Sequence, residues 1–168
     1  MDKTLKGLQT AFAGESQANR KYTAFAKKAD EDGYPQVAKL FRAAAAAETV
    51  HALSHFRAMD GVGSTESNVK AAIAGENYEA TVMYPEFIAD AESEGDAAKR
   101  GLRSFKNAME VEKVHEALYR KALESLGQPQ AETYDYYICP VCGFTAERAA
   151  PEKCPVCGAP GSRFDRIS

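Results

Sequence analysis

Residues 139–158 read CPVCGFTAERAAPEKCPVCG, two Cys-Pro-Val-Cys-Gly turns that hold all four cysteines of the chain. Two Cys-x-x-Cys pairs joined by a short loop are typical of a tetrahedral four-thiolate metal site. Each turn directs its sulfurs to one point, and the glycine that follows lets backbone amides approach them. The spacing alone leaves open whether the metal is structural zinc or redox-active iron. The predicted ligands are Cys139, Cys142, Cys154 and Cys157.

The segment around the cysteines differs in composition from the rest of the chain. After Pro129 it is first aromatic, at residues 134–138, and then rich in Pro and Gly. We predict a small metal-binding domain over residues 131–168. It is too short to bury enough surface to fold unaided, so the metal is expected to fold it. Its apolar shell is expected to be Val141, Phe144, Val156 and Phe164.

Residues 1–130 are predicted to form a four-helix bundle, which makes the protein mainly α. They are rich in Ala, Glu and Lys, and apolar residues recur at helical spacing, as at Leu5, Leu8 and Phe12. Breaks fall at three glycine-containing stretches, near residues 33, 61 and 95. Long helices with short connections are typical of a bundle. The expected helices span residues 3–32, 35–59, 66–93 and 96–126.

Composition excludes some classes of partner. The net charge is −3, and no basic run is interleaved with aromatic residues, so a nucleic-acid partner is not expected. No stretch approaches the ~18 uninterrupted apolar residues that a membrane span requires. The N-terminal residues lack the apolar core of a signal peptide. We therefore expect a cytoplasmic protein with no membrane partner, whose thiols stay reduced and available for metal.

Two Glu-x-x-His motifs lie in the second and fourth predicted helices: Glu48 with His51, and Glu112 with His115. The spacing places both side chains of each motif on one helix face. One such motif is weak, but two of them, with acids from the other two helices, match the ligand set of di-iron carboxylate bundles. Carboxylates and imidazoles suit iron or manganese. The further acids are Glu15, Glu76 and Glu79.

The alternative interpretation is that these side chains are solvated charges on helix faces, and Glu79 alone offers the best case for it. For the set as a whole, burying four or more carboxylates without a cation would be prohibitively unfavourable. His55, one turn beyond His51, and Glu110, two residues before Glu112, are expected to lie outside the ligand set.

With both sites located, the chain resembles the rubrerythrin family over nearly its full length. The resemblance implies a ferritin-like di-iron bundle followed by a rubredoxin-like domain with one iron bound by four cysteines. It also implies a peroxidase that reduces hydrogen peroxide to water in oxidative stress defence. The motifs that carry it are residues 11–16 (AFAGES), 48–51 (ETVH), 75–79 (GENYE), 83–85 (MYP), 112–115 (EKVH) and the two cysteine turns.

The resemblance also implies a role for each ligand. Glu48 and Glu112 would bridge two irons, Glu15 and Glu76 would be terminal carboxylates, and His115 would bind one iron. Electrons would come ultimately from NAD(P)H through an external donor such as rubredoxin or a reductase. The sequence itself has no strand leading into a G-x-G-x-x-G fingerprint for such a nucleotide.

The second iron, on the same resemblance, would be shared between His51 and Glu79. It would bind His51 when reduced and Glu79 when oxidised. Such an extra carboxylate offsets the charge that accumulates on oxidation, which favours a peroxidase over an oxygenase. Tyr22 and Tyr84 match tyrosines that lie beside the family's di-iron site, with plain core packing as the alternative.

The connection between the second and third predicted helices is short, from about Asp60 to Thr65. In a ferritin-like bundle these helices run in the same direction and need a long crossover. From the level of the site the chain must return about 27 Å along the bundle, at ~1.5 Å per residue. The extended connection reaches about 24 Å at most. We therefore expect a homodimer in which helices one and two of one chain complete the site of the other.

Two rival functions remain open from the sequence. One is a ferroxidase or iron-storage protein, which would form a cage and mineralise iron. The other is a zinc-ribbon interaction module on a structural bundle without redox activity. Colour separates the metals of the cysteine site, because zinc thiolates are colourless and ferric thiolates are red.

Overall fold

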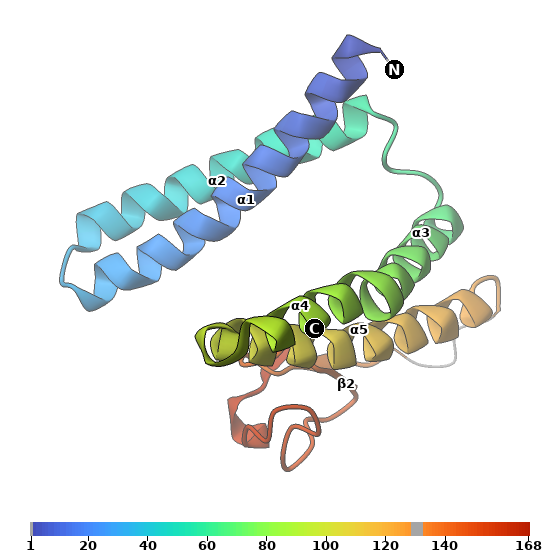
Figure 1. The fold of residues 1–168 in the computed structure, drawn as a ribbon. Coiled ribbons are helices and arrows are strands. Elements are labelled where there is room, and N and C mark those ends of the chain that lie inside the picture. Colours follow the sequence, from blue (N-terminus) through green and yellow to red (C-terminus); the bar gives the residue numbers. More distant parts are fainter. Residues whose placement is uncertain (1, 129–132) are drawn as a thin grey trace. The chain divides into compact units, whose positions relative to one another are not determined.

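The computed structural model describes residues 2–128 and 133–168, which separate into two compact units, Met1–Gly63 and Ser64–Ser168. The first unit is a helical hairpin, and the second combines further helices with a small sheet (Figure 1). The predicted domain boundary at residue 130 lies outside the described residues. Within those residues, no helix is both long and apolar enough to cross a membrane.

The hairpin consists of α1 (Lys3–Glu31) and α2 (Pro35–Ala58). Gly33 makes the turn between them with φ of 79°, a value that L side chains rarely adopt. Pro35 suits the first position of α2 because a helix start has no use for its missing N–H. Both helices agree with the predicted ranges, apart from the last residue or so at each C-terminus.

Aromatic and amide contacts hold the hairpin together. Phe12, in the first half of α1, stacks on Phe56, near the end of α2, with ring centroids 5.0 Å apart, so the helices run antiparallel. The buried amide of Asn19 donates to the Ala45 carbonyl at 2.6 Å and to the Thr49 hydroxyl at 2.8 Å. These bonds fix the register of α1 on α2, since a buried amide requires partners.

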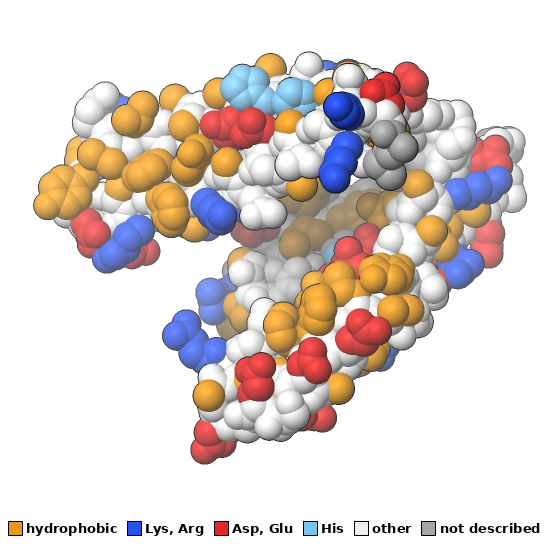
Figure 2. Space-filling model, turned by 45° about the horizontal axis from the view of Figure 1, so that its top comes forward, with side chains coloured by type: hydrophobic (Ala, Val, Ile, Leu, Met, Phe, Trp, Pro, Cys, Tyr) orange, Lys and Arg blue, Asp and Glu red, His pale blue; other side chains and the backbone are white. Residues whose placement is uncertain are grey.

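Large hydrophobic side chains remain exposed on this hairpin. Leu40 and Val50 are 67% and 65% exposed, whereas the buried positions of α2 are all alanines. Figure 2 shows hydrophobic side chains gathered on the hairpin surface. A helical pair of this kind is part of a larger bundle rather than a finished core.

The second unit begins with a long helical segment that contains one irregular turn. Ser64 caps its start by accepting a hydrogen bond from the Ser67 amide at 3.1 Å, as its position in the sequence indicates. The predicted helix at 66–93 is confirmed in extent, but the π-helical turn within it was not predicted. This segment consists of α3 (Thr65–Tyr78), the π turn η1 (Glu79–Met83) and α4 (Tyr84–Glu94). The 3₁₀ turn η2 (Gly95–Ala98) then leads into α5 (Lys99–Ser125).

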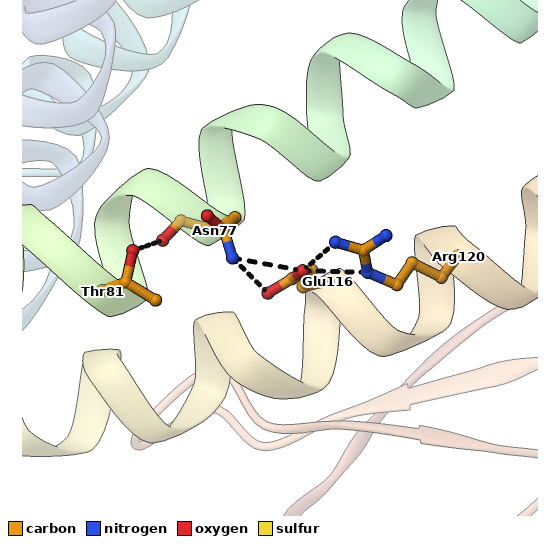
Figure 3. A network of polar contacts seen from close by, with 4 residues as sticks. All are labelled: Asn77, Thr81, Glu116 and Arg120. Carbon is orange, nitrogen blue, oxygen red and sulfur yellow. Dashed lines mark hydrogen bonds and ion pairs between the residues drawn. The ribbon is translucent and has the colours of Figure 1, made fainter.

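Polar contacts join α3 to α5 across the unit. Asn77 donates from its amide to both carboxylate oxygens of Glu116, at 3.3 and 3.2 Å, and Glu116 also accepts from Arg120 (Figure 3). Just beyond Asn77, the Thr81 hydroxyl donates to its carbonyl at 2.7 Å within the π turn. The network holds α3 and α5 side by side at the level of the π turn.

The C-terminal part of the second unit is a small antiparallel sheet with strand order β2-β1-β3. Buried Cys139 and Cys154 form its centre, packed against Phe144, Val156 and Phe164 as predicted. Val141 was wrongly assigned to this shell: it is 46% exposed, at the tip of a turn whose sulfurs occupy the interior side. The strands are β1 (Tyr136–Ile138), β2 (Thr145–Glu147) and β3 (Asp165–Ile167), with a 3₁₀ turn η3 (Gly161–Arg163) before β3.

Candidate metal centres

The four cysteines converge on one point. The Sγ atoms of Cys139 and Cys157 lie 3.6 Å apart, and those of Cys142 and Cys154 lie 3.5 Å apart. These distances are too long for disulfides, and a tetrahedral metal with bonds of about 2.3 Å requires sulfurs roughly 3.8 Å apart. All four thiols are free. The donor set therefore fits one thiolate-bound metal ion, as predicted.

The two turns that carry the cysteines have the same backbone design. Gly143 donates its N–H to the Cys139 carbonyl, and Gly158 donates to the Cys154 carbonyl, each at 2.9 Å. Both glycines have positive φ, 86° and 77°, so the glycines in the motif are required by the turn. The repeated geometry brings the two pairs of sulfurs together from opposite sides of the site.

Backbone amides favour the thiolate form of one cysteine, Cys154. Burial acts to raise the pKa of Cys154, but hydrogen bonds from the Cys157 and Val156 amides to its sulfur lower that pKa to about 7. Burial raises the pKa of Cys142 instead. The unequal pKa values mean that metal binding must displace protons from the site, which couples its affinity to pH.

In the hairpin, the predicted ligands Glu15, Glu48 and His51 come together. Their ligand atoms lie within 4.8 Å of one another. Nδ1 of His51 is 2.9 Å from a carboxylate oxygen of Glu48, as the i, i+3 spacing predicts. Among the described residues, Nε2 of His51 has no hydrogen-bond partner, and the His51 side chain is 56% exposed.

In the second unit, Glu76, Glu112 and His115 form the matching group, again with ligand atoms within 4.8 Å. Nδ1 of His115 lies 2.8 Å from Glu112 and 3.8 Å from Glu76. Nε2 lies 2.9 Å from the hydroxyl of Thr145, the first residue of β2. The His115 side chain is only 27% exposed. No sequence motif pointed to Thr145, because its place depends on how the small sheet packs on α5.

The negative charges around Glu76, Glu112 and His115 favour a bound cation. Burial, and then the charge of Glu112, raise the pKa of Glu76. Burial, and then the charge of Glu76, raise the pKa of Glu79. Carboxylates that repel each other in a partly buried place are stabilised when a cation sits between them. The arrangement therefore suits a metal ion with oxygen and nitrogen ligands.

The π turn places Glu79 and Tyr84 together. The Tyr84 N–H donates to the Glu79 carbonyl, five residues back, which closes one wide turn. In a regular α-helix these residues would point about 140° apart, whereas the wide turn brings them nearer to one side. Burial, and then the charges of Glu112, Glu79 and Glu76, raise the pKa of Tyr84, so its phenol stays protonated beside the carboxylates.

The remaining candidates lie elsewhere. Tyr22 packs in the hairpin against Phe25 and Phe41, with centroids 6.4 and 6.0 Å away, and its role at the site stays a prediction. Glu110 forms an exposed ion pair with Lys113, in keeping with its expected place outside the ligand set.

The fold and the donor sets together define a class: a helical protein with carboxylate–histidine metal groups and a four-cysteine domain. Comparison with known proteins makes the class specific. The family model "Rubrerythrin" matches residues 6–123, and "Rubrerythrin, rubredoxin-like domain" matches residues 137–165. The chain belongs to the rubrerythrin family.

Individual relatives cover almost the whole chain. Nigerythrin of Nitratidesulfovibrio vulgaris is 36% identical over 96% of this chain and 85% of its own length. Rubrerythrin of Porphyromonas gingivalis is also 36% identical, over 98% of this chain and 93% of its own length. The solved structure of fully reduced, all-ferrous nigerythrin has a TM-score of 0.58 at 34% identity, covering 99% of this chain and 88% of that one.

Family membership confirms several predictions. The fold is mainly α, with a ferritin-like part followed by a rubredoxin-like domain. The cofactors are those of a di-iron carboxylate site and a rubredoxin-like four-cysteine iron site, and the clustered donors fit them. The protein is therefore an iron-binding oxidoreductase, and a zinc ribbon without redox activity loses its support.

Proposed function

We propose that this protein is a non-haem di-iron peroxidase that reduces hydrogen peroxide to water. Electrons enter through the rubredoxin-like iron centre, and the protein serves in oxidative stress defence. The observation that carries the proposal is Glu79, a fourth acidic or imidazole donor next to the group of Glu76, Glu112 and His115. A surplus carboxylate is what a site needs if one iron changes ligand as its charge changes.

The proposed di-iron site uses one copy of each carboxylate–histidine group. On the family resemblance, Glu48 and Glu112 would be the carboxylates shared by the two irons, and each lies within 3 Å of Nδ1 of its own histidine. Glu15 and Glu76 are terminal ligands, and His115 binds one iron.

His51 and Glu79 would be the alternative ligands of the second iron. His51 is suited to release the metal, since in the hairpin nothing among the described residues holds its Nε2. His115 is held from both ring nitrogens and stays bound. The asymmetry of the two histidines supports a site in which only one iron moves.

Reduction of peroxide needs two electrons and two protons to give two waters. When bound, the ferrous pair supplies the two electrons to the O–O bond. The protonated phenol of Tyr84, beside Glu76 and Glu79, is placed to donate a hydrogen bond or a proton at that point. Tyr22 is proposed to do the same from the hairpin.

The electron donor is a separate protein. The chain has no nucleotide-binding fingerprint, so NAD(P)H acts through rubredoxin or a reductase that reduces the four-cysteine iron. We place the protein in the cytoplasm, where reduced thiols are available to bind iron.

The active form is proposed to be a homodimer with exchanged helices. The connection between α2 and α3 is partly used up by the helix end: Asp60 donates its N–H to the Arg57 carbonyl at 2.9 Å, and Gly61 donates to the Phe56 carbonyl at 3.0 Å. Asp60 has φ of 54°, and a Cβ at Gly61 would clash with the Phe56 ring. These residues turn back on α2 instead of extending away from it.

The remaining reach is too short for a crossover within one chain. From Gly61 to Thr65 the chain can span about 14 Å at most, at ~3.5 Å per residue. Bringing Glu76 level with His51 in a ferritin-like bundle requires about 27 Å along the axis. The exposed hydrophobic residues of the hairpin, such as Leu40 and Val50, therefore pack on the second unit of another copy.

The experiment that tests the function compares oxidants. Anaerobically reduced, iron-loaded protein is mixed with equal amounts of hydrogen peroxide or oxygen, and oxidation of the di-iron site is followed by absorbance. The peroxidase proposal expects peroxide to react faster, with two waters formed per peroxide and no mineral. A ferroxidase would instead react readily with oxygen and accumulate ferric mineral in a cage-sized assembly, which would contradict the proposal.

A further inference from the structure

The imidazole of His115 has a partner on each side. Nδ1 faces Glu112, 2.8 Å from its carboxylate oxygen, and Nε2 lies 2.9 Å from Oγ1 of Thr145. The Thr145 hydroxyl in turn donates to the Gly143 carbonyl at 3.2 Å. Gly143 directly follows Cys142, one of the four thiolate ligands. A short chain of contacts thus runs from one metal centre to the other.

The direction of each hydrogen bond follows once a metal is bound. With Nδ1 of His115 used as the metal ligand, the neutral imidazole would carry its proton on Nε2, which donates to Oγ1 of Thr145. The hydroxyl proton of Thr145 then goes to the Gly143 carbonyl. Histidines that bind metals usually donate their other N–H to such a partner, and this partner sets the tautomer and the ring orientation.

The contact belongs to a built interface between the small sheet and α5. A Cβ at Gly143 would lie 3.7 Å from Val111, which is buried one turn before His115. Farther along α5, Lys121 forms an ion pair with Glu147 at 2.7 Å. The Thr145 bond therefore lies between two other contacts of the same interface.

We propose that Thr145 is a positioning residue that holds His115 for metal binding and couples the four-cysteine site to the di-iron site within the segment Ser64–Ser168 of one chain. The proposal rests on the proposed function. The route runs from Cys142 through the Gly143 carbonyl and the Thr145 hydroxyl to His115. With iron in both sites, one electron would pass from the ferrous four-cysteine ion to a ferric ion held by His115, and every hydrogen bond would keep its proton.

The equivalent position in the hairpin has no such link. Among the described residues, Nε2 of His51 has no partner, so no comparable route ends there. The proposed route therefore ends at His115.

The first test needs no activity. Thr145→Val removes the hydroxyl but keeps the side-chain shape, and Thr145→Ser is the matched control that keeps the hydroxyl. In zinc-loaded, diamagnetic protein, nitrogen-resolved NMR reports the Nε2 proton of His115. We expect slow solvent exchange of this proton in the wild type and in Thr145→Ser, and fast exchange in Thr145→Val.

The second test measures coupling between the iron centres. After the four-cysteine iron alone is reduced by a light pulse, its reoxidation by the di-ferric site is followed at its visible absorbance. Thr145→Val should slow this step about 10- to 100-fold, whereas Thr145→Ser stays near the wild-type rate.

The proposal is overturned if Thr145→Val keeps the protected Nε2 proton or the wild-type transfer rate. It is also overturned if both variants are impaired equally, since that would indicate packing alone. A protein with the protected proton and fast transfer, but with no preference for peroxide over oxygen, would contradict the proposed function and leave the role of Thr145 intact.

Discussion

His51 and His115 occupy equivalent positions in their two Glu-x-x-His motifs, yet their surroundings differ. His115 is bound on both ring nitrogens and lies beside Glu79, whose charge interacts with it. His51 has one carboxylate partner, Glu48, and a largely exposed ring. At the scale of single residues, this difference supports the proposal that His115 stays bound and that His51 is the replaceable ligand.

Glu79→Ala tests the replaceable ligand. Without the carboxylate, the oxidised site loses the anion that offsets its added positive charge. We expect oxidation of the reduced di-iron site by peroxide to slow by at least about tenfold, which corresponds to about 1.4 kcal/mol of transition-state stabilisation. Stopped-flow absorbance with iron content measured on the same sample gives the rate per loaded site.

The matched control is Glu86→Ala, which removes an exposed carboxylate from the first turn of α4. It should keep the wild-type rate. If Glu79→Ala also keeps that rate, His51 and Glu79 do not exchange, and the residue-level account of peroxide specificity is wrong.

The sequence predicts which candidate donors lie together, because helix geometry is local. The i, i+3 spacing alone places Glu48 with His51 and Glu112 with His115, and the structure has both pairs in contact. Thr145 could not be found in this way. Its contact with His115 links residues 30 positions apart, and it depends on tertiary packing that no short motif encodes.

At the scale of elements, the π turn η1 is what regular helical periodicity misses. The predicted helix at 66–93 is continuous, but a wide turn at Glu79–Met83 changes which residues share a face. The side chains of Glu76 and Glu112 meet before the turn, and the charges of both act on Tyr84, which follows it. A constant 3.6 residues per turn would place Glu79 and Tyr84 about 140° apart.

Asn19 is expected to be the most sensitive polar residue of the hairpin. Asn19→Ala removes two hydrogen bonds to α2 from a buried position. We expect the free energy of unfolding to fall by about 1–3 kcal/mol. Urea unfolding at fixed protein concentration measures it, with the exposed Gln17→Ala as control, expected within about 0.5 kcal/mol of wild type. Equal losses in the two variants would show that Asn19 does not fix the register.

The C-terminal sheet is expected to depend on its metal. Its three short strands enclose little besides the cysteines and four apolar side chains. Removing the metal with a chelator under reducing conditions should abolish amide protection in β1, β2 and β3 and leave α1 and α2 protected. Hydrogen exchange measures both, and refilling with zinc should restore the strands. Strands that stay protected without metal would contradict this dependence.

At the scale of the whole molecule, the length of one connection determines the assembly. The sequence already predicts that the segment between α2 and α3 is slightly too short for a crossover. The structure strengthens this, because Asp60 and Gly61 are bonded back to α2 and cannot extend. The predicted helix ranges alone could not reveal this turn at the end of α2, since it depends on how the Phe56 ring packs on Gly61.

Complementation between two inactive chains tests the exchanged dimer. Glu48→Ala disables the hairpin group, and Glu112→Ala disables the second group. Co-expressed with different tags and purified as heterodimers, the two chains should regain one di-iron site per dimer, because one site receives only intact groups. Each variant alone should have none. Iron content and di-ferric absorbance measure this, and heterodimers without any restored site would show that each bundle forms within one chain.

The central claim is that peroxide is reduced at the di-iron site with electrons drawn through the four-cysteine iron. The most direct measurement is anaerobic stopped-flow mixing of fully reduced protein with hydrogen peroxide, following both centres by absorbance. The account predicts fast oxidation of the di-iron site, followed by oxidation of the four-cysteine iron at the rate of internal transfer. Oxidation of the four-cysteine iron by peroxide at the same rate in protein that lacks di-iron would contradict it.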